Sequence, residues 1–321
     1  MNIIKAGSSG VLLPDLNIEF DCSGTDGGHT FISHAHADHM PRSKKSRVYC
    51  TAYTRALMRE RGFEGTAQVL EFGTPLDTQR ARITLYPAGH ILGSAMVFVE
   101  SERGNVLYTG DCRIPPSPAS EGFALPGRRV DHLVTEATFA LPIYKWDSHE
   151  KLASEVRSFA SDSLKNDFAP VFLAYDLGKA QEIMQMLAPL NRPLQISRAC
   201  YNLCKIYERA GFHLGSYETY TSSTCEGKIL IASSHALNNG FPADVSKKRI
   251  AYCSGWATGT TRFVGPSIDK MIPLSDHLDF FELIELCKGL RPEKVYLTHT
   301  PNASVVQHYL DNLNIDSRLL E

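Results

Sequence analysis

The chain has 321 residues, of which 43% are hydrophobic and 21% are charged, and its formal net charge is −2. This composition excludes a disordered or fibrous protein, and the length allows about two domains with a large core. Because the overall charge is close to zero, a polyanionic partner would have to be held by a local basic groove or by bound metal ions.

The eight cysteines include no CxxC pair, and in a chain of this length they do not form the pattern of a disulfide framework. We therefore expect free thiols in a reducing compartment. Residues 1–13 are too few and too polar for a signal peptide, and no stretch approaches the roughly 20 apolar residues of a membrane span. The sequence predicts a cytoplasmic protein without a membrane partner.

The first 140 residues predict short strands separated by turns. A helix is predicted over residues 51–61, because Thr51 can cap its N-terminus and Gly62 can end it. The predicted strands are β-prone runs bounded by Gly, Pro or Asp, at residues 17–20, 30–32, 82–86, 95–100 and 106–109.

The pattern changes after residue 147, where helices and strands alternate. Helices are predicted at about 148–163 and 178–187, and strands at 170–175, 228–233 and 249–253. This alternation favours a parallel α/β unit. A last helix and strand are predicted at 278–290 and 294–298. We expect an inserted domain at 147–260 within a domain built from residues 1–146 and 261–321.

The strongest chemical signal follows the predicted strand at 30–32. His34, His36, Asp38 and His39 lie within six residues of one another. A tight loop after a strand can direct the first two side chains toward one cation and the last two toward a second. Imidazole and carboxylate ligands suit zinc, and also manganese. A purely structural role would make this clustering of titratable groups costly.

Three further strand ends carry a candidate ligand or its support. His90 follows the strand at 82–86 with glycines near it, and Asp111 follows the strand at 106–109. Asp111 is a candidate bridging carboxylate. Asp21 follows the strand at 17–20 and would orient the ligands or a nucleophilic water, although a turn aspartate is the alternative.

These motifs resemble those of metallo-β-lactamase-fold hydrolases, which implies a four-layer αββα sandwich. A second set of motifs resembles the β-CASP subgroup of nucleic-acid nucleases, which carries an inserted α/β domain. The matching segments are Thr135–Phe139, Leu173–Glu182, Ser275–Asp279 and Tyr296–His299, so the resemblance covers nearly the whole chain. Within the subgroup, Glu136–Trp146 and Ser254–Trp256 are most similar to prokaryotic DNA ligase-associated exonucleases.

The sequence departs from the subgroup pattern at a few positions. Ala137 and Ala140 replace an expected Ser and Gly, Asp176 replaces a small residue, and Thr300-Pro301 follow the last histidine where Gly is common. None of these positions is an expected ligand, so they bear on substrate specificity.

The resemblance implies two divalent metal ions, with zinc favoured over manganese. The first would be held by His34, His36, His90 and Asp111, and the second by Asp38, His39, His299 and the shared Asp111. The ions would activate water for attack on phosphorus. His277 would protonate the leaving oxygen, and Glu136 would hold its other ring nitrogen. A helix-start residue is the alternative for His277.

Several basic or strand-end residues are candidates for phosphate contacts. Arg42 and Lys44 follow the metal loop, although such a charge run is also typical of a solvated surface. Lys179 lies at a predicted helix start. Ser254 and Gly255 lie at a strand end, where they could hold a terminal phosphate.

The resemblance implies a DNA exonuclease of DNA repair that starts from the 5′ end and works with a DNA ligase or helicase. DNA is favoured over RNA, but the same motifs also fit an RNA-processing endo- or exoribonuclease. A non-catalytic scaffold would lack metal ligands, whereas every expected ligand is present here. A small-molecule hydrolase of the same fold remains a further alternative.

Overall fold

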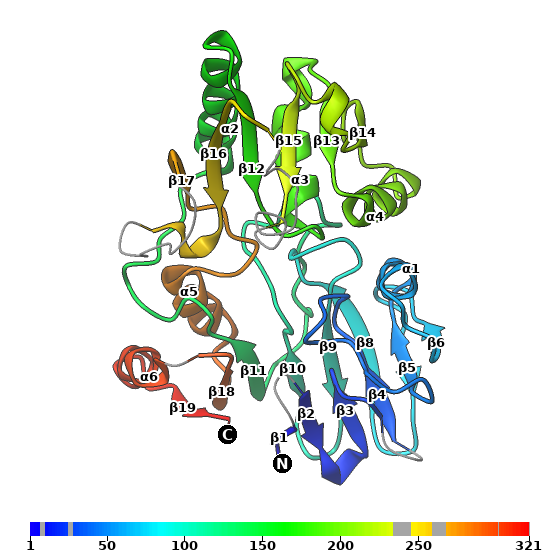
Figure 1. Ribbon diagram of the computed structural model, residues 1–321. Helices are drawn as coiled ribbons and strands as arrows, with labels where there is room; N and C mark the ends of the chain where they lie inside the picture. The colour runs from blue at the N-terminus through cyan, green and yellow to red at the C-terminus, as the bar shows by residue number, and fades with distance from the viewer. Residues whose placement is uncertain (7–9, 25–27, 234–244, 259–267, 301, 321) are drawn as a thin grey trace. The chain divides into compact units, whose positions relative to one another are not determined.

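The computed structural model describes residues 1–6, 10–24, 28–233, 245–258, 268–300 and 302–320. The chain forms two units, which Figure 1 shows coloured from the N- to the C-terminus. The first unit contains Met1–Lys145 and His277–Glu321, and the inserted unit contains Trp146–Asp276. Each unit is described by itself.

Two sheets form the centre of the first unit. The six-stranded sheet has the order β1-β2-β3-β4-β5-β6, with β1 Ile4–Ala6, β2 Gly10–Leu13, β3 Ile18–Phe20, β4 His29–Phe31, β5 Arg47–Cys50 and β6 Thr66–Val69. The seven-stranded sheet has the order β19-β18-β11-β10-β9-β8-β7, with β7 Leu76–Asp77, β8 Arg82–Pro87, β9 Ala95–Glu100, β10 Val106–Tyr108, β11 His132–Glu136, β18 Lys294–Thr298 and β19 Asp316–Leu319.

Successive side chains along the strands of the seven-stranded sheet point to opposite faces, so the two faces contribute to two separate cores. Val97 and Val99 of β9 pack with Phe20 and Phe31 of the other sheet, which forms the core between the two sheets. Phe98, between them in sequence, instead packs against the helices α5, Phe280–Leu290, and α6, Ala303–Asp311.

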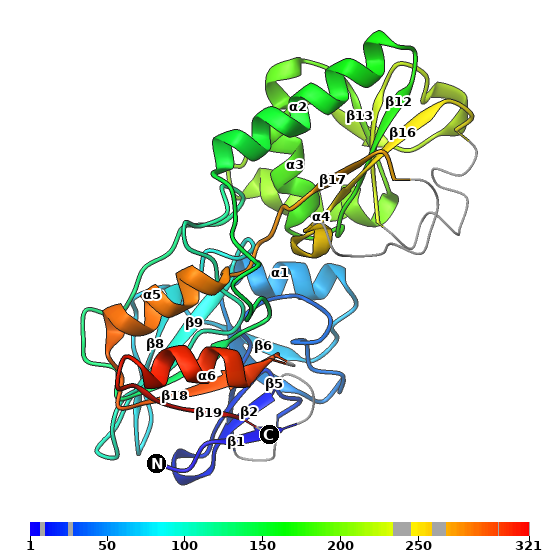
Figure 2. The same cartoon turned by 90° about the vertical axis from the view of Figure 1, so that its left-hand side faces the viewer.

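Helices complete the layers of the first unit. Helix α1, Ala52–Glu60, packs against β6 of the six-stranded sheet, and α5 and α6 cover the seven-stranded sheet, as Figure 2 shows. The order of layers is helix, sheet, sheet, helix. The predicted αββα sandwich is therefore confirmed.

The inserted unit is built on a parallel sheet. Its strand order is β14-β13-β15-β12-β16-β17, and every pair of neighbouring strands runs parallel. The strands are β12 Ala169–Leu173, β13 Leu194–Ile196, β14 Tyr217–Thr219, β15 Ile229–Ala232, β16 Lys248–Cys253 and β17 Lys270–Ile272, and the helices are α2 His149–Lys165, α3 Lys179–Leu187 and α4 Arg198–Arg209. The alternation of helices and strands along the sequence produces this arrangement.

The inserted unit extends further along the chain than the sequence led us to expect. The expected boundary at residue 260 lies outside the described residues. Strand β17 pairs in parallel with β16, so the chain stays in the inserted sheet through residue 272 and leaves this unit at Asp276. A three-residue strand with one Lys and two apolar residues carries too little pattern to be predicted.

Among the described residues, no helix combines the length and the apolar composition needed to cross a bilayer.

Candidate active site

The site is assembled at one edge of the first unit, where several strands end. Strands β3 and β4 run parallel, so the segments that follow Phe20 and Phe31 leave the same edge of their sheet. Strands β10, β11 and β18 also run parallel to one another, and β8 points the same way because it is antiparallel to β9, as β10 is. The strand ends therefore bring together side chains that are far apart in sequence: Asp21, His34, His36, Asp38, His39, His90, Asp111, Glu136 and His299.

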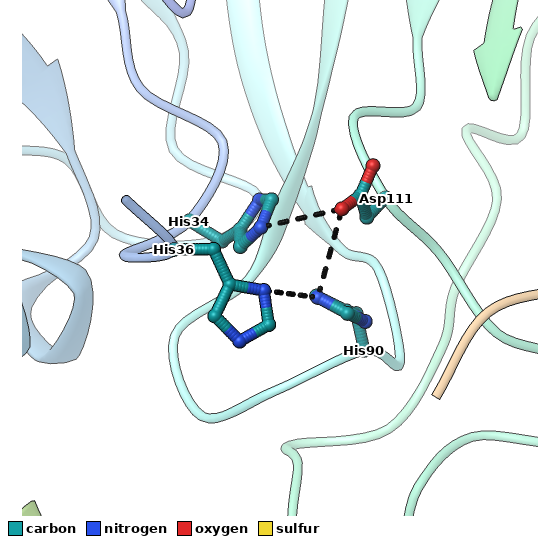
Figure 3. A group of neighbouring side chains, drawn as sticks. All are labelled: His34, His36, His90 and Asp111. Carbon is teal, nitrogen blue, oxygen red and sulfur yellow. Dashed lines mark hydrogen bonds and ion pairs between the residues drawn. The ribbon is translucent and has the colours of Figure 1, made fainter. Parts of the chain in front are cut away.

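Four of these side chains form a group that can hold one metal ion. The ligand atoms of His34, His36, His90 and Asp111 all lie within 4.8 Å of one another, and Figure 3 shows them converging. Asp111 Oδ2 is 3.5 Å from His34 Nε2 and 3.8 Å from His90 Nε2. His90 Nε2 is 3.0 Å from His36 Nδ1. Tetrahedral zinc ligands at their usual bond lengths lie about 3.4 Å apart, so these separations match.

A second group meets the first at Asp111. The same Oδ2 atom lies 3.4 Å from His39 Nε2, and Asp38 Oδ2 lies 3.6 Å from that nitrogen. The ring centroid of His299 is 5.4 Å from that of His39. Asp38 remains 61% exposed, which makes it the most open of the expected ligands.

The hydrogen bonds of the buried histidines prepare their other ring nitrogens for a cation. His39 Nδ1 faces Asp21 at 2.7 Å, His34 Nδ1 faces the Ser33 hydroxyl at 3.0 Å, and His299 Nδ1 faces the Thr298 hydroxyl at 3.1 Å. The Nε2 atoms of all three histidines are buried and have no hydrogen-bond partner among the described residues. A proton on Nδ1 leaves the Nε2 lone pair free, which is the tautomer that binds metal. The donor set therefore fits divalent metal ions.

Asp21 is the centre of the network behind the ligands. Its Oδ1 accepts the Ser33 backbone N–H at 2.7 Å. Its Oδ2 accepts the Ser33 and Tyr108 hydroxyls, both at 2.7 Å, in addition to His39 Nδ1. These hydrogen bonds to Ser33, Tyr108 and His39 favour the first of the two expected roles of Asp21, which is to orient the ligands.

Gly110 allows Asp111 to come close to the metal loop. Its backbone has φ 54°, in the left-handed region. A Cβ atom at this position would lie 2.6 Å from Ser33 Cβ and 2.7 Å from Ser33 Oγ. The sequence Gly110-Asp111 thus combines a turn that only glycine makes without strain with a close contact to the loop that carries His34.

The loop that carries His90 is fixed at Gly93. The Gly93 carbonyl accepts both the Thr51 and Thr54 hydroxyls at 2.7 Å, from the N-terminus of α1. The Gly93 N–H donates to both carboxylate oxygens of Glu121, at 3.0 and 2.8 Å. These contacts hold the backbone three residues beyond His90.

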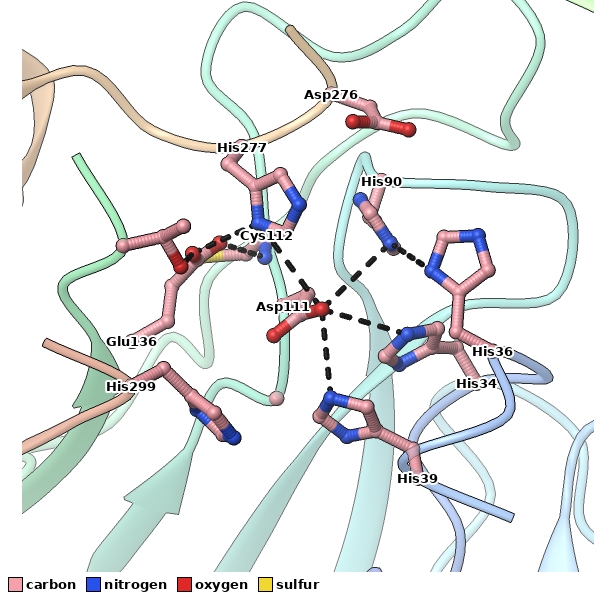
Figure 4. Close-up of polar contacts among 12 residues, drawn as sticks. His34, His36, His39, His90, Asp111, Cys112, Glu136, Asp276, His277 and His299 are labelled. Atoms are coloured by element: carbon pink, nitrogen blue, oxygen red, sulfur yellow. Dashed lines mark hydrogen bonds and ion pairs between the residues drawn. The ribbon is translucent and has the colours of Figure 1, made fainter. Parts of the chain in front are cut away.

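Glu136 and His277 form a pair beside the ligands, which Figure 4 shows. Glu136 Oε2 lies 2.8 Å from His277 Nδ1 and accepts the Thr138 hydroxyl at 2.6 Å. Its Oε1 accepts the Cys112 N–H at 2.9 Å, and the Cys112 carbonyl accepts the Leu278 N–H at 2.9 Å. The ring of His277 is 20% exposed and lies 4.8 Å, centroid to centroid, from that of His90.

The alternative role of His277, as a residue that starts helix α5, is taken by Asp279. Asp279, not His277, caps α5: its side chain accepts the Glu282 N–H at 2.8 Å, and Glu282 accepts the Asp279 N–H at 2.8 Å. His277 is therefore available for chemistry with its Nδ1 bonded to Glu136.

The charges at the site suit a cation. Burial lowers the pKa of His34 well below its ordinary value, and His39 acts in the same direction. Burial also acts to lower the pKa of His39, but the carboxylates of Asp111 and Asp21 hold it well above its ordinary value. Burial acts to raise the pKa of Asp111, but His39 and His277 hold it well below its ordinary value. Asp111 is thus ionised and His34 neutral, the forms that ligate metal, and a metal on His39 replaces a proton.

The basic residues that we expected to contact phosphate differ in their exposure. Arg42 and Lys44 are exposed after the metal loop, and Lys44 pairs with Glu64 at 2.8 Å. Lys179 is 3% exposed and its ammonium pairs with Asp276 at 2.7 Å, so it does not present an open cation.

Two further candidates lie in the inserted unit. Ser254 is buried, and its hydroxyl accepts the Trp256 N–H at 3.2 Å at the start of the short helix Gly255–Ala257. Gly255 is buried beside it. Both residues belong to the inserted unit, whereas the candidate metal ligands belong to the first unit.

Sequence reasoning did not find the residues that support the ligands. Ser33, Tyr108, Thr138 and Glu121 each donate to or accept from a group described above. Ser33 and Tyr108 lie just before recognised motifs, so a search of the residues next to each motif could have found them. Glu121 lies in a loop without any motif, and nothing in the sequence marked it.

No family model matches the chain. It is 30% identical over 295 residues to a protein of Opitutus terrae named "Probable DNA ligase", a match that covers 91% of this chain and 28% of that protein. It is 27% identical over 279 residues to "5' exonuclease Apollo" of Gallus gallus, covering 82% of this chain and 56% of that protein. It is 26% identical over 177 residues to "RNase J-like protein" of Methanocaldococcus jannaschii, covering 49% of this chain and 42% of that protein.

The chain spans between about a quarter and just over half of the length of these relatives. They are β-CASP proteins of the metallo-β-lactamase fold. The layered sheets, the histidine and aspartate group at the strand ends and the parallel inserted sheet agree with that relationship. The chain belongs to the β-CASP subgroup of metallo-β-lactamase-fold nucleases.

Proposed function

We propose that this chain is a metal-dependent nuclease that hydrolyses phosphodiester bonds. The observation that carries the proposal is the position of Asp111 Oδ2, which lies 3.5 Å from His34 Nε2 and 3.4 Å from His39 Nε2. One carboxylate oxygen thus faces both ligand groups. Neighbouring ligand groups that share a carboxylate would hold two divalent ions, and two-metal sites are typical of enzymes that displace an oxygen at phosphorus.

The proposed ligands follow the two groups. His34, His36, His90 and Asp111 would hold the first ion. Asp38, His39, His299 and the shared Asp111 would hold the second. Imidazole and carboxylate ligands favour zinc, and manganese also accepts them.

The residues of the chain supply the proton chemistry. When bound, the ions supply Lewis acidity that activates water and offsets the charge of the phosphate. Glu136 accepts a hydrogen bond from His277 Nδ1, and when the ring is protonated at both nitrogens, Nε2 on the other side of the ring carries a transferable proton. His277 donates that proton to the leaving oxygen, and Glu136 stabilises the ring as its charge changes. Asp21 keeps His39 oriented throughout.

DNA is the proposed substrate, cut as an exonuclease from the 5′ end in DNA repair. Two relatives support this: one is named for a DNA ligase and one for a 5′ exonuclease. The first name also supports a ligase as a partner, and a helicase is the other partner that the resemblance implies. Arg42 and Lys44 would contact phosphates, and Ser254 and Gly255 would lie near a terminal phosphate. A cytoplasmic location accompanies this role.

RNA is the second candidate substrate. The chain is also similar to the RNase J-like protein and, at 26% identity over 203 residues, to "Endoribonuclease ysh1" of Schizosaccharomyces pombe. An RNA-processing enzyme would use the same ligands and the same Glu136–His277 pair.

A cleavage assay on protein of defined metal content tests the proposal. The substrates are end-labelled single-stranded DNA and RNA of matched sequence, with and without a 5′ phosphate. Asp38→Ala removes a ligand, and His277→Ala removes the proton donor. We expect metal-dependent removal of nucleotides from the 5′ end of DNA, with a loss of about 100-fold or more in His277→Ala at unchanged metal content.

The outcomes separate the candidates. Preferential loss of RNA would support the second candidate with the same site. If the metal-loaded wild-type protein cuts neither polymer, the nuclease proposal is wrong, although the family assignment stands.

A further inference from the structure

A basic groove lies in the first unit at the edge of the six-stranded sheet opposite the metal ligands. Its volume is about 1210 Å³. Its side-chain lining includes Lys44, Lys45, Arg47, His29 and Tyr49, and none of the described residues that line it is acidic. We call it the β4–β6 groove, after the strands that form its floor.

The strand pairing explains why these side chains share one surface. Arg47 and Tyr49 alternate along β5 and therefore point to the same face of the sheet. Their partners in β6 are Thr66 and Gln68, and all four face the groove. His29 of β4 joins them, with its ring centroid 6.0 Å from that of Tyr49.

The groove begins where the apolar core ends. Tyr49 stacks on Phe31 with ring centroids 5.1 Å apart, and Phe31 is fully buried between the two sheets. On the same sheet face, beyond Tyr49, the side chains become polar and exposed: Arg47, Thr66 and Gln68. The ring of Tyr49, held in place by Phe31, thus lies next to the exposed cation of Arg47 on the same sheet face.

Two of the three cations that line the groove have no carboxylate partner among the described residues. Lys44 pairs with Glu64, but no carboxylate among the described residues pairs with Lys45 or Arg47. Unpaired Lys and Arg beside aromatic rings on an open sheet are the chemistry that binds single-stranded nucleic acid, because cations contact phosphates and rings stack on bases.

We propose that the β4–β6 groove is a second binding site, which holds the phosphodiester backbone of a single-stranded nucleic acid at a distance from the bond being cut. The proposal rests on the proposed function, since it extends the path of the same substrate. The metal loop leaves the C-terminal end of β4, whereas the groove lies at its N-terminal end. At ~3.3 Å per residue, the chain from His29 to His34 spans about 16 Å. A mononucleotide or dinucleotide cannot occupy both places.

The double variant Lys45→Ala/Arg47→Ala tests this site. Arg103→Ala/Lys288→Ala is the matched control, because it removes two exposed cations of the same unit elsewhere and changes the net charge equally. Binding of labelled 30-nucleotide chains and dinucleotides of DNA and RNA is measured by fluorescence anisotropy, in metal-loaded protein that also carries His277→Ala so that the ligand survives.

We expect the test variant to weaken binding of the 30-nucleotide chain about tenfold near 0.15 M salt and to leave the dinucleotide unchanged. The slope of log K against log salt is negative, and each lost phosphate contact makes it less steep by about 0.7 for single strands. The loss of two contacts should therefore make it less steep by about 1.4. The control variant should behave as the parent. An equal loss for both chain lengths, or an unchanged salt slope, would overturn the proposal.

Two further measurements separate this site from the proposed function and from other anions. Hydrolysis of a small chromogenic phosphodiester by Lys45→Ala/Arg47→Ala, with His277 intact, should equal that of the wild-type protein. If the wild-type protein hydrolyses nothing but the length-dependent loss of binding persists, the groove stands and the nuclease proposal falls. If polyglutamate displaces the 30-nucleotide chain as well as unlabelled DNA does, the nucleic-acid assignment is wrong.

Discussion

At the scale of single residues, the site depends on which nitrogen of each imidazole carries the proton. Asp21, Ser33 and Thr298 each engage the Nδ1 atom of one histidine, so each Nε2 faces the place of a cation. Asp21 has the widest effect, because it bonds His39 directly and also holds Ser33, which contacts His34.

Asp21→Asn should therefore weaken metal binding without removing a ligand. An asparagine offers an NH2 group where one carboxylate oxygen now accepts three hydrogen bonds, so at least one of His39, Ser33 and Tyr108 loses its acceptor. We expect a 10- to 100-fold loss of metal affinity, measured by competition with a chromogenic chelator. Tyr108→Phe removes one donor alone and should cost less. Equal affinity in Asp21→Asn and the wild-type protein would show that Asp21 is a turn residue.

The structure brings the predicted ligands together, and the sequence could indicate them because their spacing is local. His34, His36, Asp38 and His39 lie in one loop, and His90 and Asp111 each follow a recognisable strand. The supporting residues could not be predicted in the same way. Tyr108 reaches Asp21 across two sheets, a contact that depends on how the sheets pack. Lys179 was predicted to contact phosphate from its helix start, whereas its burial and its pairing with Asp276 depend on tertiary contacts that the sequence does not show.

At the scale of secondary structure elements, the turn after β10 is the most constrained position. Gly110→Ala adds a Cβ that meets Ser33 at a φ of 54°. We expect this change to lower the free energy of unfolding by about 2–4 kcal/mol, since it combines backbone strain with a contact to fixed atoms. Gly122→Ala is the control, because Gly122 has φ 98° but no atom within 4 Å of an added Cβ. Urea unfolding measures both. Equal losses would mean that the contact with Ser33 costs nothing.

Helix α5 carries a carboxyl group whose ionisation is coupled to folding. Burial raises the pKa of Glu282 from 4.5 to about 7, although the Asp279 N–H acts to lower it. Asp279 and Glu136 also act to raise it, and Arg113 acts to lower it. The folded protein therefore binds more protons than the unfolded chain between pH 4.5 and 7. Stability from this group is present below pH 4.5 and declines as the pH rises to about 7.

Glu282→Gln tests this coupling. Glutamine keeps the capping geometry but does not titrate. Relative to the variant, the wild-type protein should lose stability between pH 5 and 8, as measured by urea unfolding at constant ionic strength with the same metal content. A constant difference across this range would show that Glu282 keeps an ordinary pKa.

The helices were predicted correctly where the sequence carried a clear capping or apolar pattern. Helix α1 begins after Thr51, whose hydroxyl accepts the Thr54 N–H, as the cap predicted. Helix α5 begins two residues later than predicted, because Asp279 is its cap. Helix α4 was not predicted, although Cys200, Leu203, Cys204 and Tyr207 form its buried stripe. Cysteine and tyrosine give a weaker apolar signal than leucine, so the helical spacing of these buried residues was hard to recognise in the sequence.

At the scale of the whole molecule, the chain leaves the inserted unit at Asp276, next to His277. Lys179 at the start of α3 pairs there with Asp276, and both side chains are 3% exposed. A buried ion pair gains little over apolar residues of the same size, but the loss of one partner leaves an uncompensated charge.

Lys179→Met should thus lower the free energy of unfolding by about 3–5 kcal/mol, and adding Asp276→Leu should restore most of it. The comparison is made by urea unfolding of the two variants and the wild-type protein. If Lys179→Met instead leaves stability unchanged and weakens only the binding of 5′-phosphorylated DNA, the original prediction of a phosphate contact is correct.

The pairing of β18 with β11 has a consequence for how the protein is made. Strand β11 is synthesised before the whole inserted unit, and β18 after it, yet the two strands are neighbours in one sheet. On the ribosome, the nascent chain therefore exposes His34, His36, His90 and Asp111 well before His299 emerges. Domains generally fold as they are completed, so the inserted unit has time to fold while its host still lacks a central strand. With the ligand groups proposed above, the first group would be complete early in translation, whereas the second would need the last part of the chain.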